Sequence, residues 1–146
     1  MRPLVVLLAL LALAALPVGA VADSWSETGA LQASRAEAAA TLLPSGQVLA
    51  AGGVAGTVIA FSTSTAERYD PAGGAWVATG VLDQGRAGPG LSTLPDGGAL
   101  LTGGGDFTIG SADVFASTLV FDPTTNGWSA AAPMPNPHYD QTQVTL

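Results

Sequence analysis

A segment of twelve residues recurs in this chain in nearly the same form. The sequence LLPSGQVLAAGG at residues 42–53 returns as TLPDGGALLTGG at residues 93–104, which is 51 positions later. A repeat at this spacing is typical of one supersecondary unit that is copied along the chain and stacked on its neighbour. The fold must therefore be one that both copies can adopt.

Three tryptophans, 51 and 52 residues apart, set the register of the repeat over the rest of the chain. In this register an arginine, a Gly-Gly pair and an aromatic residue before Asp-Pro also recur. We expect these recurring residues to have structural roles. They are Trp25, Arg35, Gly52, Gly53, Tyr69, Asp70, Trp76, Arg86, Gly103, Gly104, Phe121, Asp122 and Trp128.

Each copy contains four short candidate strands, which are separated by Pro-x-Gly and Asp-Pro turn signals. The candidate strands cover residues 38–43, 47–52, 65–69 and 75–79 in the first copy, and 90–94, 99–103, 117–121 and 128–131 in the second. A helix over 33–43 is excluded because the equivalent second-copy segment contains Gly85, Gly88, Pro89 and Gly90. The pattern predicts an all-β protein made of four-stranded antiparallel units.

The order of Arg, Gly-Gly, Tyr-Asp-Pro and Trp resembles the kelch repeat in its bacterial form, which covers residues 25–146 here. The resemblance implies a segment of a kelch-type β-propeller with two complete blades, at about 36–80 and 87–132, and lone flanking strands at about 24–30 and 138–146. Phe121 for Tyr, His138 for Arg and the Gly88-Pro89-Gly90 run depart from the pattern. Kelch propellers close a ring of more than two blades, so we expect either a fragment of a longer protein or self-association through the exposed blade faces.

Residues 1–22 have the pattern of a secretory signal peptide. Arg2 precedes an apolar run over residues 4–16, and a small-residue stretch ends at Ala22. An uncleaved membrane anchor is the alternative, but the run is shorter than the ~20 residues of a spanning helix and Pro17 breaks it. The sequence predicts export, cleavage near Ala22 and a mature chain of residues 23–146 without a stable membrane anchor.

The chain is acidic, with 11 Asp and Glu against 4 Lys and Arg, a net charge of −7. Cleavage would remove Arg2 and leave 3 − 11 = −8. Affinity for nucleic acid depends on Lys and Arg contacts to phosphates, so nucleic acid is not an expected partner. The sequence contains no cysteine, so disulfides cannot contribute to its stability.

One edge of the predicted sheets carries two long loops that differ between the copies, at residues 54–63 and 105–117. Binding surfaces of repeat proteins tend to form where loops vary over a rigid scaffold, so we expect an extracellular protein or a glycan to bind here. For the apolar residues, packing between blades is the alternative. The candidate binding residues are Ile59, Phe61, Asp106, Phe107, Ile109, Asp113 and Phe115.

Residues that would suggest an enzyme or a metal site are few. Asp106 and Asp113 are two carboxylates where calcium takes six to eight oxygens. Arg35 and Arg86 either bind an anion or, as their recurrence favours, donate to backbone carbonyls between blades. The resemblance also extends to galactose oxidase-like copper enzymes, whose centres use Tyr, His and a Tyr–Cys cross-link. This chain has one His (His138), two Tyr and no Cys, and cannot supply that centre.

The sequence therefore predicts a secreted kelch-repeat binding or interaction module, without catalytic residues, metal or cofactor of its own. Two alternatives stay open. One is an N-terminal piece of a galactose oxidase-like copper-radical oxidase whose catalytic residues lie outside this chain, and the other is a structural component of the cell surface or matrix.

Overall fold

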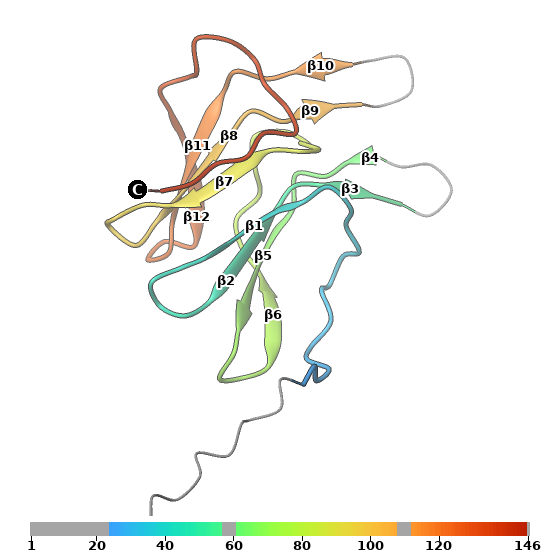
Figure 1. The fold of residues 1–146 in the computed structure, drawn as a ribbon, viewed down its shortest axis with the longest axis vertical. Helices are drawn as coiled ribbons and strands as arrows, with labels where there is room; N and C mark the ends of the chain where they lie inside the picture. Colours follow the sequence, from blue (N-terminus) through green and yellow to red (C-terminus); the bar gives the residue numbers. More distant parts are fainter. Residues whose placement is uncertain (1–23, 57–60, 108–111, 146) are drawn as a thin grey trace, which may run out of the picture.

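Two four-stranded antiparallel sheets form the body of the protein (Figure 1). The computed structural model describes residues 24–56, 61–107 and 112–145, and in these ranges it contains no helix. The first sheet has the order β1-β2-β5-β6 and the second the order β12-β11-β8-β7. Their strands are β1 (Ala39–Leu42), β2 (Val48–Ala51), β5 (Ala66–Asp70), β6 (Ala75–Ala78), β7 (Gly90–Thr93), β8 (Ala99–Thr102), β11 (Thr118–Asp122) and β12 (Gly127–Ala131). The predicted all-β fold and its eight strands are confirmed to within one residue at each end.

Four further strands form two short ribbons that the sequence analysis did not anticipate. β3 (Val54–Ala55) pairs with β4 (Phe61–Ser62), and β9 (Gly105–Asp106) pairs with β10 (Asp113–Val114). Each ribbon follows a Gly-Gly pair in which both residues have positive φ, 66° and 98° in the first copy and 59° and 86° in the second. Glycine adopts such angles without steric cost, so the chain bends there and resumes pairing in a new direction.

The expected lone strands at about 24–30 and 138–146 are wrong for the residues that the structure describes. Neither 24–30 nor 138–145 is a strand. Gly29 N donates to Gly74 O at 3.1 Å in the turn between β5 and β6. Residues 141–145 lie beside β7 (Figure 1) and bind the second sheet mainly through side chains, such as Gln143 Nε2 to Ser92 Oγ at 2.6 Å. A strand is defined by a ladder of backbone hydrogen bonds to a neighbouring strand, and neither segment forms such a ladder with the described residues.

The core lies between the two sheets, where one face of the first sheet packs on one face of the second. Leu49 and Ala51 of β2 meet Leu101 of β8 and Phe121 of β11, and all four are fully buried. At the inner strands, Thr41 Oγ1 of β1 lies 2.9 Å from Thr93 Oγ1 of β7. Burial of a leucine or phenylalanine side chain contributes about 1.5–3 kcal/mol, so this interface stabilises the pair of sheets.

Each sheet pairs its tryptophan with an aromatic residue on the neighbouring strand. The rings of Tyr69 and Trp76 have centroids 5.3 Å apart, and those of Phe121 and Trp128 are 5.1 Å apart. In both sheets the two residues are directly opposite in the ladder. Trp25, by contrast, is fully exposed. The register that the tryptophans set is therefore also the structural register of the two sheets.

The hydrogen bonds that join one unit to the next recur at the repeat spacing. Gly53 N donates to Arg86 O at 2.7 Å, and Gly104 N donates to His138 O at 2.9 Å. Three further bonds recur in the same way: Gly88 N to Glu37 O and Asp140 N to Gly88 O; Arg86 N to Thr63 O and His138 N to Phe115 O; Thr93 Oγ1 to Leu42 O and Thr145 Oγ1 to Thr93 O. Residues 138–145 therefore contact the second sheet as residues 86–93 contact the first.

Candidate functional site

The two ribbons lie side by side at one edge of the molecule (Figure 1). Ser62 at the end of β4 joins them, because its Oγ donates to Gly105 O at 3.2 Å and lies 3.3 Å from the donating Phe107 N. Residues 138–140 run past the same place, since His138 N donates to Phe115 O. We call this surface, formed by β3, β4, β9, β10, Phe107 and residues 138–140, the ribbon edge.

Three exposed aromatic side chains gather on the ribbon edge. Phe61 is 50% exposed, Phe107 is 39% exposed and Tyr139 is 54% exposed. The rings of Phe107 and Tyr139 meet edge to face, with centroids 5.3 Å apart. Single exposed apolar residues are common, but a group of them marks a candidate contact surface.

Two carboxylates oppose each other in the second ribbon. Asp106 and Asp113 are ladder partners in β9 and β10, an arrangement in which like charges repel. Asp106 Oδ1 is buried, and no hydrogen bond from the described residues reaches it. Within the described ranges, no group of three or more His, Cys, Asp or Glu is placed to hold a metal ion. The pair therefore concentrates negative charge at the ribbon edge.

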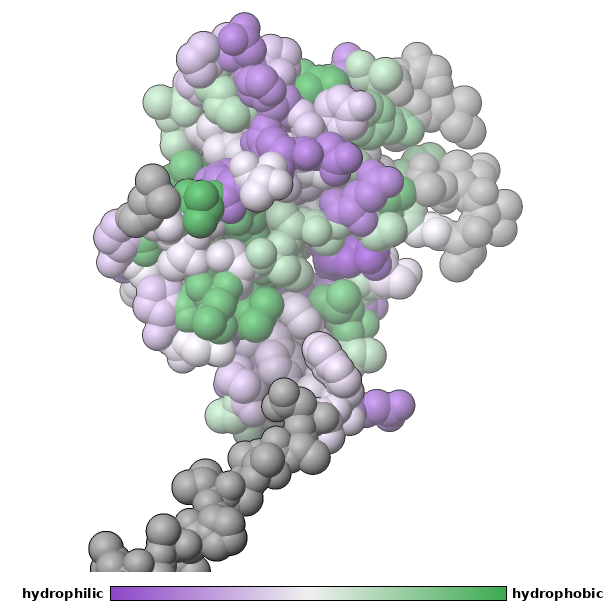
Figure 2. All heavy atoms as spheres, viewed as in Figure 1, coloured by the Kyte–Doolittle hydropathy of each residue, from purple (hydrophilic) through white to green (hydrophobic). Residues whose placement is uncertain are grey.

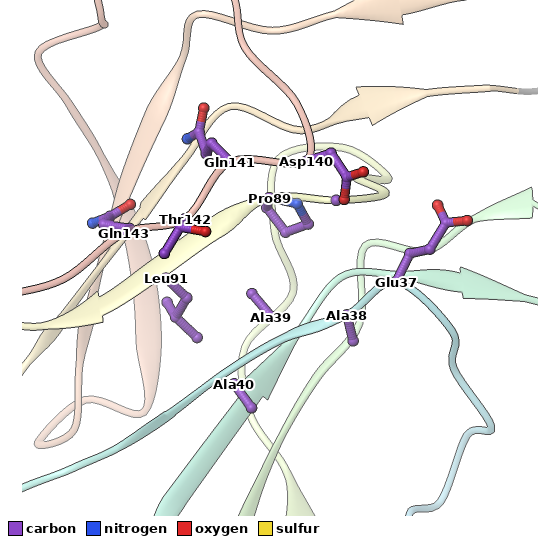
Figure 3. A pocket seen from close by; sticks show the side chains of 11 residues that line it. Glu37, Ala38, Ala39, Ala40, Pro89, Leu91, Asp140, Gln141, Thr142 and Gln143 are labelled. Atoms are coloured by element: carbon purple, nitrogen blue, oxygen red, sulfur yellow. The ribbon is translucent and has the colours of Figure 1, made fainter.

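A cavity of about 320 Å³ lies between β1, β7 and the C-terminal segment, next to the ribbon edge (Figure 3). Its lining comes from residues 37–40, residues 88, 89 and 91, and residues 140–143. Figure 3 shows the carboxylates of Glu37 and Asp140 at the end toward the ribbons, with Gln141 and Gln143 at the other end. Figure 2 shows hydrophilic residues in a band that crosses this face toward the ribbons. The carboxylate and amide oxygens of the lining can therefore accept hydrogen bonds, and the carboxylates can attract a positively charged group.

Glu37 and Asp140 occupy the same position of the repeat, and their backbones share one conformation. Glu37, Gly88 and Asp140 each lie two residues after the repeated Arg or His position, and their φ angles are 53°, 56° and 57°. Left-handed backbone is uncommon for residues other than glycine, and Asp adopts it more readily than most. The sequence analysis missed Glu37 and Asp140, although the register position that they share with Gly88 was a signal.

The structure brings some predicted binding residues together and assigns another to packing. Phe61, Asp106, Phe107 and Asp113 lie on the ribbon edge, and their role in binding stays a prediction. Phe115 instead places its ring 5.2 Å from the guanidinium carbon of Arg86 and is half-buried. Ile59 and Ile109 lie outside the described residues.

Arg35 links the first Gly-Gly pair to β5. Its Nη1 donates to Gly52 O and Thr65 O, both at 2.9 Å, and its Nη2 donates to Glu67 at 2.6 Å. The side chains of Arg35 and Glu67 are 2% and 3% exposed. An anion from solvent cannot reach this guanidinium, so the contacts are those of a structural residue.

Arg86 repeats these contacts in the second copy with a different carboxylate. Its Nη1 donates to Gly103 O at 2.7 Å and Ser117 O at 3.2 Å, while its Nη2 contacts both oxygens of Asp83 at 2.8 and 2.9 Å. Leu119 occupies the place that Glu67 has in the first sheet, so the counter-charge comes from Asp83 before the arginine. The side chain of Arg86 is completely buried.

The Arg35–Glu67 pair predicts a pH dependence of stability. Burial raises the pKa of Glu67, but hydrogen bonds from Gln32 N, Arg35 and Ala33 N together with the charge of Arg35 outweigh it, so the pKa lies below its ordinary 4.5. A carboxyl with a lowered folded pKa stabilises fully above its ordinary pKa and loses this contribution as pH falls through the folded value. We expect the wild type to lose more unfolding free energy than Glu67→Gln between about pH 7 and about pH 3, measured by urea titration. Equal losses in the two proteins would contradict this role of Glu67.

These features define an all-β protein whose antiparallel sheets repeat along the chain. No family model matches the chain, and no curated protein matches it in sequence. Among solved structures it is similar to YjhT, with 20% sequence identity and a TM-score of 0.68. The match covers 80% of this chain and 43% of the YjhT chain, so this chain spans less than half of YjhT. At this identity the likeness concerns the fold.

The predicted signal peptide at residues 1–22 lies outside the described residues. In the part of the chain that is described, no helix has the length and apolar character to cross a membrane.

Proposed function

We propose that the two sheets are blades of a kelch-type β-propeller segment. The observation that supports this best is the recurrence of the junction bonds. Gly53 and Gly104 each donate to the segment that follows their sheet, and stacking of blades by one repeated displacement would require such a recurrence. The residues that resemble the kelch pattern have matching places in both sheets: each arginine donates to the carbonyl of a Gly-Gly pair, and each tryptophan lies in an outer strand.

We further propose that the protein is a secreted binding module and that the ribbon edge is its contact surface. The loops of the two copies differ there in sequence, exposed aromatic rings lie on this surface, and its residue Asp140 also lines the cavity. The opposite edge consists of tight turns with a local role. Ala72 N donates to Asp70 at 3.1 Å and Thr124 N donates to Asp122 at 2.8 Å. The hydrogen bond from Thr124 N, with others from the same turn, also lowers the pKa of Asp122.

A site-specific cross-link tests the binding function. A photoreactive phenylalanine analogue replaces Phe107 on the ribbon edge, or Ser45 in the exposed turn between β1 and β2 as the matched control. The protein is irradiated with extracellular proteins and glycans of the producing cells. We expect a discrete adduct from position 107 and none from position 45, because aromatic anchors carry much of the energy of protein interfaces. Adducts of equal yield from both positions, or none from either, would refute the assignment.

Export has a separate test. N-terminal sequencing of protein recovered from the culture medium is expected to begin at Asp23. Recovery only from the cell interior, with Met1 or Arg2 retained, would contradict the proposed secretion.

A further inference from the structure

We infer that Asn126 and Gly127 form a self-modifying site, at which the asparagine slowly converts to aspartate or isoaspartate and loosens the junction of the two sheets. The inference is independent of the proposed binding function. It draws on the chemistry of the Asn-Gly pair, on the contacts of Asn126 and on the residues that the first copy has at the same two positions.

Asn126 lies in the turn between β11 and β12 and is bonded across the junction to the end of the first sheet. Its backbone oxygen accepts from Gly80 N at 2.8 Å, and its Nδ2 donates to Ala78 O at 3.3 Å. Gly74 holds the same repeat position in the first copy, where its carbonyl accepts from Gly29 N. Asn126 and Gly74 both have left-handed backbone, with φ of 55° and 64°. A change at residue 126 therefore acts directly on a contact between the two units.

The reaction needs only the two residues and water. The backbone nitrogen of Gly127 loses its proton to the solvent and attacks Cγ of Asn126, and the Cγ–Nδ2 bond breaks to release ammonia. The product is a cyclic imide. Water then opens either the bond from Cγ to the nitrogen, which gives aspartate, or the bond from the main-chain carbonyl carbon, which gives isoaspartate. No oxidant or reductant takes part.

The local structure favours this reaction at Asn126. Glycine has no side chain to shield the attacking nitrogen, whereas the other asparagine of the sequence, Asn136, precedes Pro137, whose nitrogen carries no hydrogen. The Asn126 amide is weakly held, because its bond to Ala78 O is long and no hydrogen bond from the described residues reaches its Oδ1. Residues 122, 124 and 125 of the turn are exposed, and exposed turns open more readily than buried strands.

The products cannot keep the contact that asparagine makes. A carboxylate only accepts hydrogen bonds, so its oxygen would face Ala78 O with no donor between them. Isoaspartate also lengthens the main chain by a methylene group next to Gly127, which is the first residue of β12 and the ladder partner of Asp122. Both products therefore weaken this side of the junction.

Mass spectrometry of the aged protein tests the site. The purified protein is incubated in mildly acidic or mildly alkaline buffer and digested with chymotrypsin, which cleaves after Phe121 and Trp128. The peptide of residues 122–128 contains Asn126 as its only amide side chain. We expect its mass to rise with time as OH replaces NH2, and faster in alkaline buffer, because the attacking nitrogen must lose a proton. A synthetic peptide of residues 122–128 checks that the conditions permit the reaction.

Two variants separate the chemistry from the contact, and each introduces the residue of the first copy. Gly127→Ala takes the residue of the equivalent Ala75, and a Cβ there would lie in ordinary contact with Thr125 Oγ1 at 3.5 Å. It keeps the bonds of Asn126 but should slow the mass increase at least several-fold, because a methyl group shields the nitrogen. Asn126→Gly takes the residue of Gly74 and should abolish the increase.

Urea unfolding measures the effect of the modification on the junction. We expect Asn126→Asp, which reproduces the aspartate product, to unfold at a lower urea concentration than the wild type. Asn136→Asp adds the same charge at an exposed position and should leave the urea midpoint nearly unchanged.

Three results would overturn the inference. One is a constant mass of residues 122–128 in the protein under conditions in which the synthetic peptide reacts. Another is an equal rate in the wild type and in Gly127→Ala, which would exclude the glycine nitrogen as the attacking group. The third is a urea midpoint of Asn126→Asp that is no lower than that of Asn136→Asp, which would show that the junction does not depend on the asparagine.

Discussion

Replacing Arg86 by methionine is expected to destabilise the protein by about 2–5 kcal/mol, because it leaves two backbone carbonyls at the buried guanidinium without their donor, and each unsatisfied buried acceptor costs about 1–3 kcal/mol. Methionine fills a similar volume but donates no hydrogen bond. Gly103 O and Ser117 O would lose their donor at the buried junction, and Asp83 would lose its counter-charge. Native proteins are stable by only about 5–15 kcal/mol, so the loss is a large part of the total. Urea unfolding followed by tryptophan fluorescence measures it.

Arg68→Met is the matched control. Arg68 lies in β5 and is half-buried, and no hydrogen bond or ion pair of its side chain is recorded among the described residues. We expect its substitution to change the free energy of unfolding by less than about 1 kcal/mol, as is usual away from buried networks. Similar losses in the two variants would show that the buried contacts of Arg86 do not stabilise the protein more than a half-buried arginine in a strand does.

Replacing Gly52 by alanine is expected to cost about 3–5 kcal/mol, through backbone strain and overpacking together. Gly52 has a φ of 66°, and a Cβ there would lie 2.5 Å from Arg86 O and 3.3 Å from Pro89 Cγ. These atoms belong to the segment that enters the second sheet, so the clash would push the two units apart. Thermal and urea unfolding of the variant measure the loss.

Gly46→Ala separates strain from packing. Gly46 has a φ of 83°, and a Cβ at this position would meet nothing within 4 Å. Its substitution should cost only the strain of about 1–2 kcal/mol. If Gly52→Ala and Gly46→Ala lost the same free energy of unfolding, the close approach of the following segment to Gly52 would not be what requires glycine there.

The strands of the two sheets were predictable because their signals are local. Pro-x-Gly and Asp-Pro end strands by fixing or forbidding particular φ angles and ladder bonds, and they do so in both copies. The cross-strand places of Trp76 and Trp128 follow from the same register. The repeat supplied a further condition, since any assignment had to suit two different sequences.

The ribbons and the cavity were not predictable in the same way. Strands of two residues, such as β3 and β9, carry no alternating pattern, and their pairing follows from the bend at the Gly-Gly pairs. The cavity is formed by three segments that are distant in sequence, so only the tertiary structure brings Glu37 and Asp140 to one cavity. The counter-charge of the repeated arginine is Glu67 in the first copy and Asp83 in the second, and this difference also depends on three-dimensional proximity.

A crystal structure of the purified protein tests the central claim that successive units stack by one repeated displacement. The account predicts that the rotation and translation carrying the first sheet onto the second also carry residues 86–93 onto 138–145. Thr145 would then contact Thr93 O as Thr93 contacts Leu42 O. Sheets that pack through other faces, or a segment 138–145 docked away from β7, would contradict it.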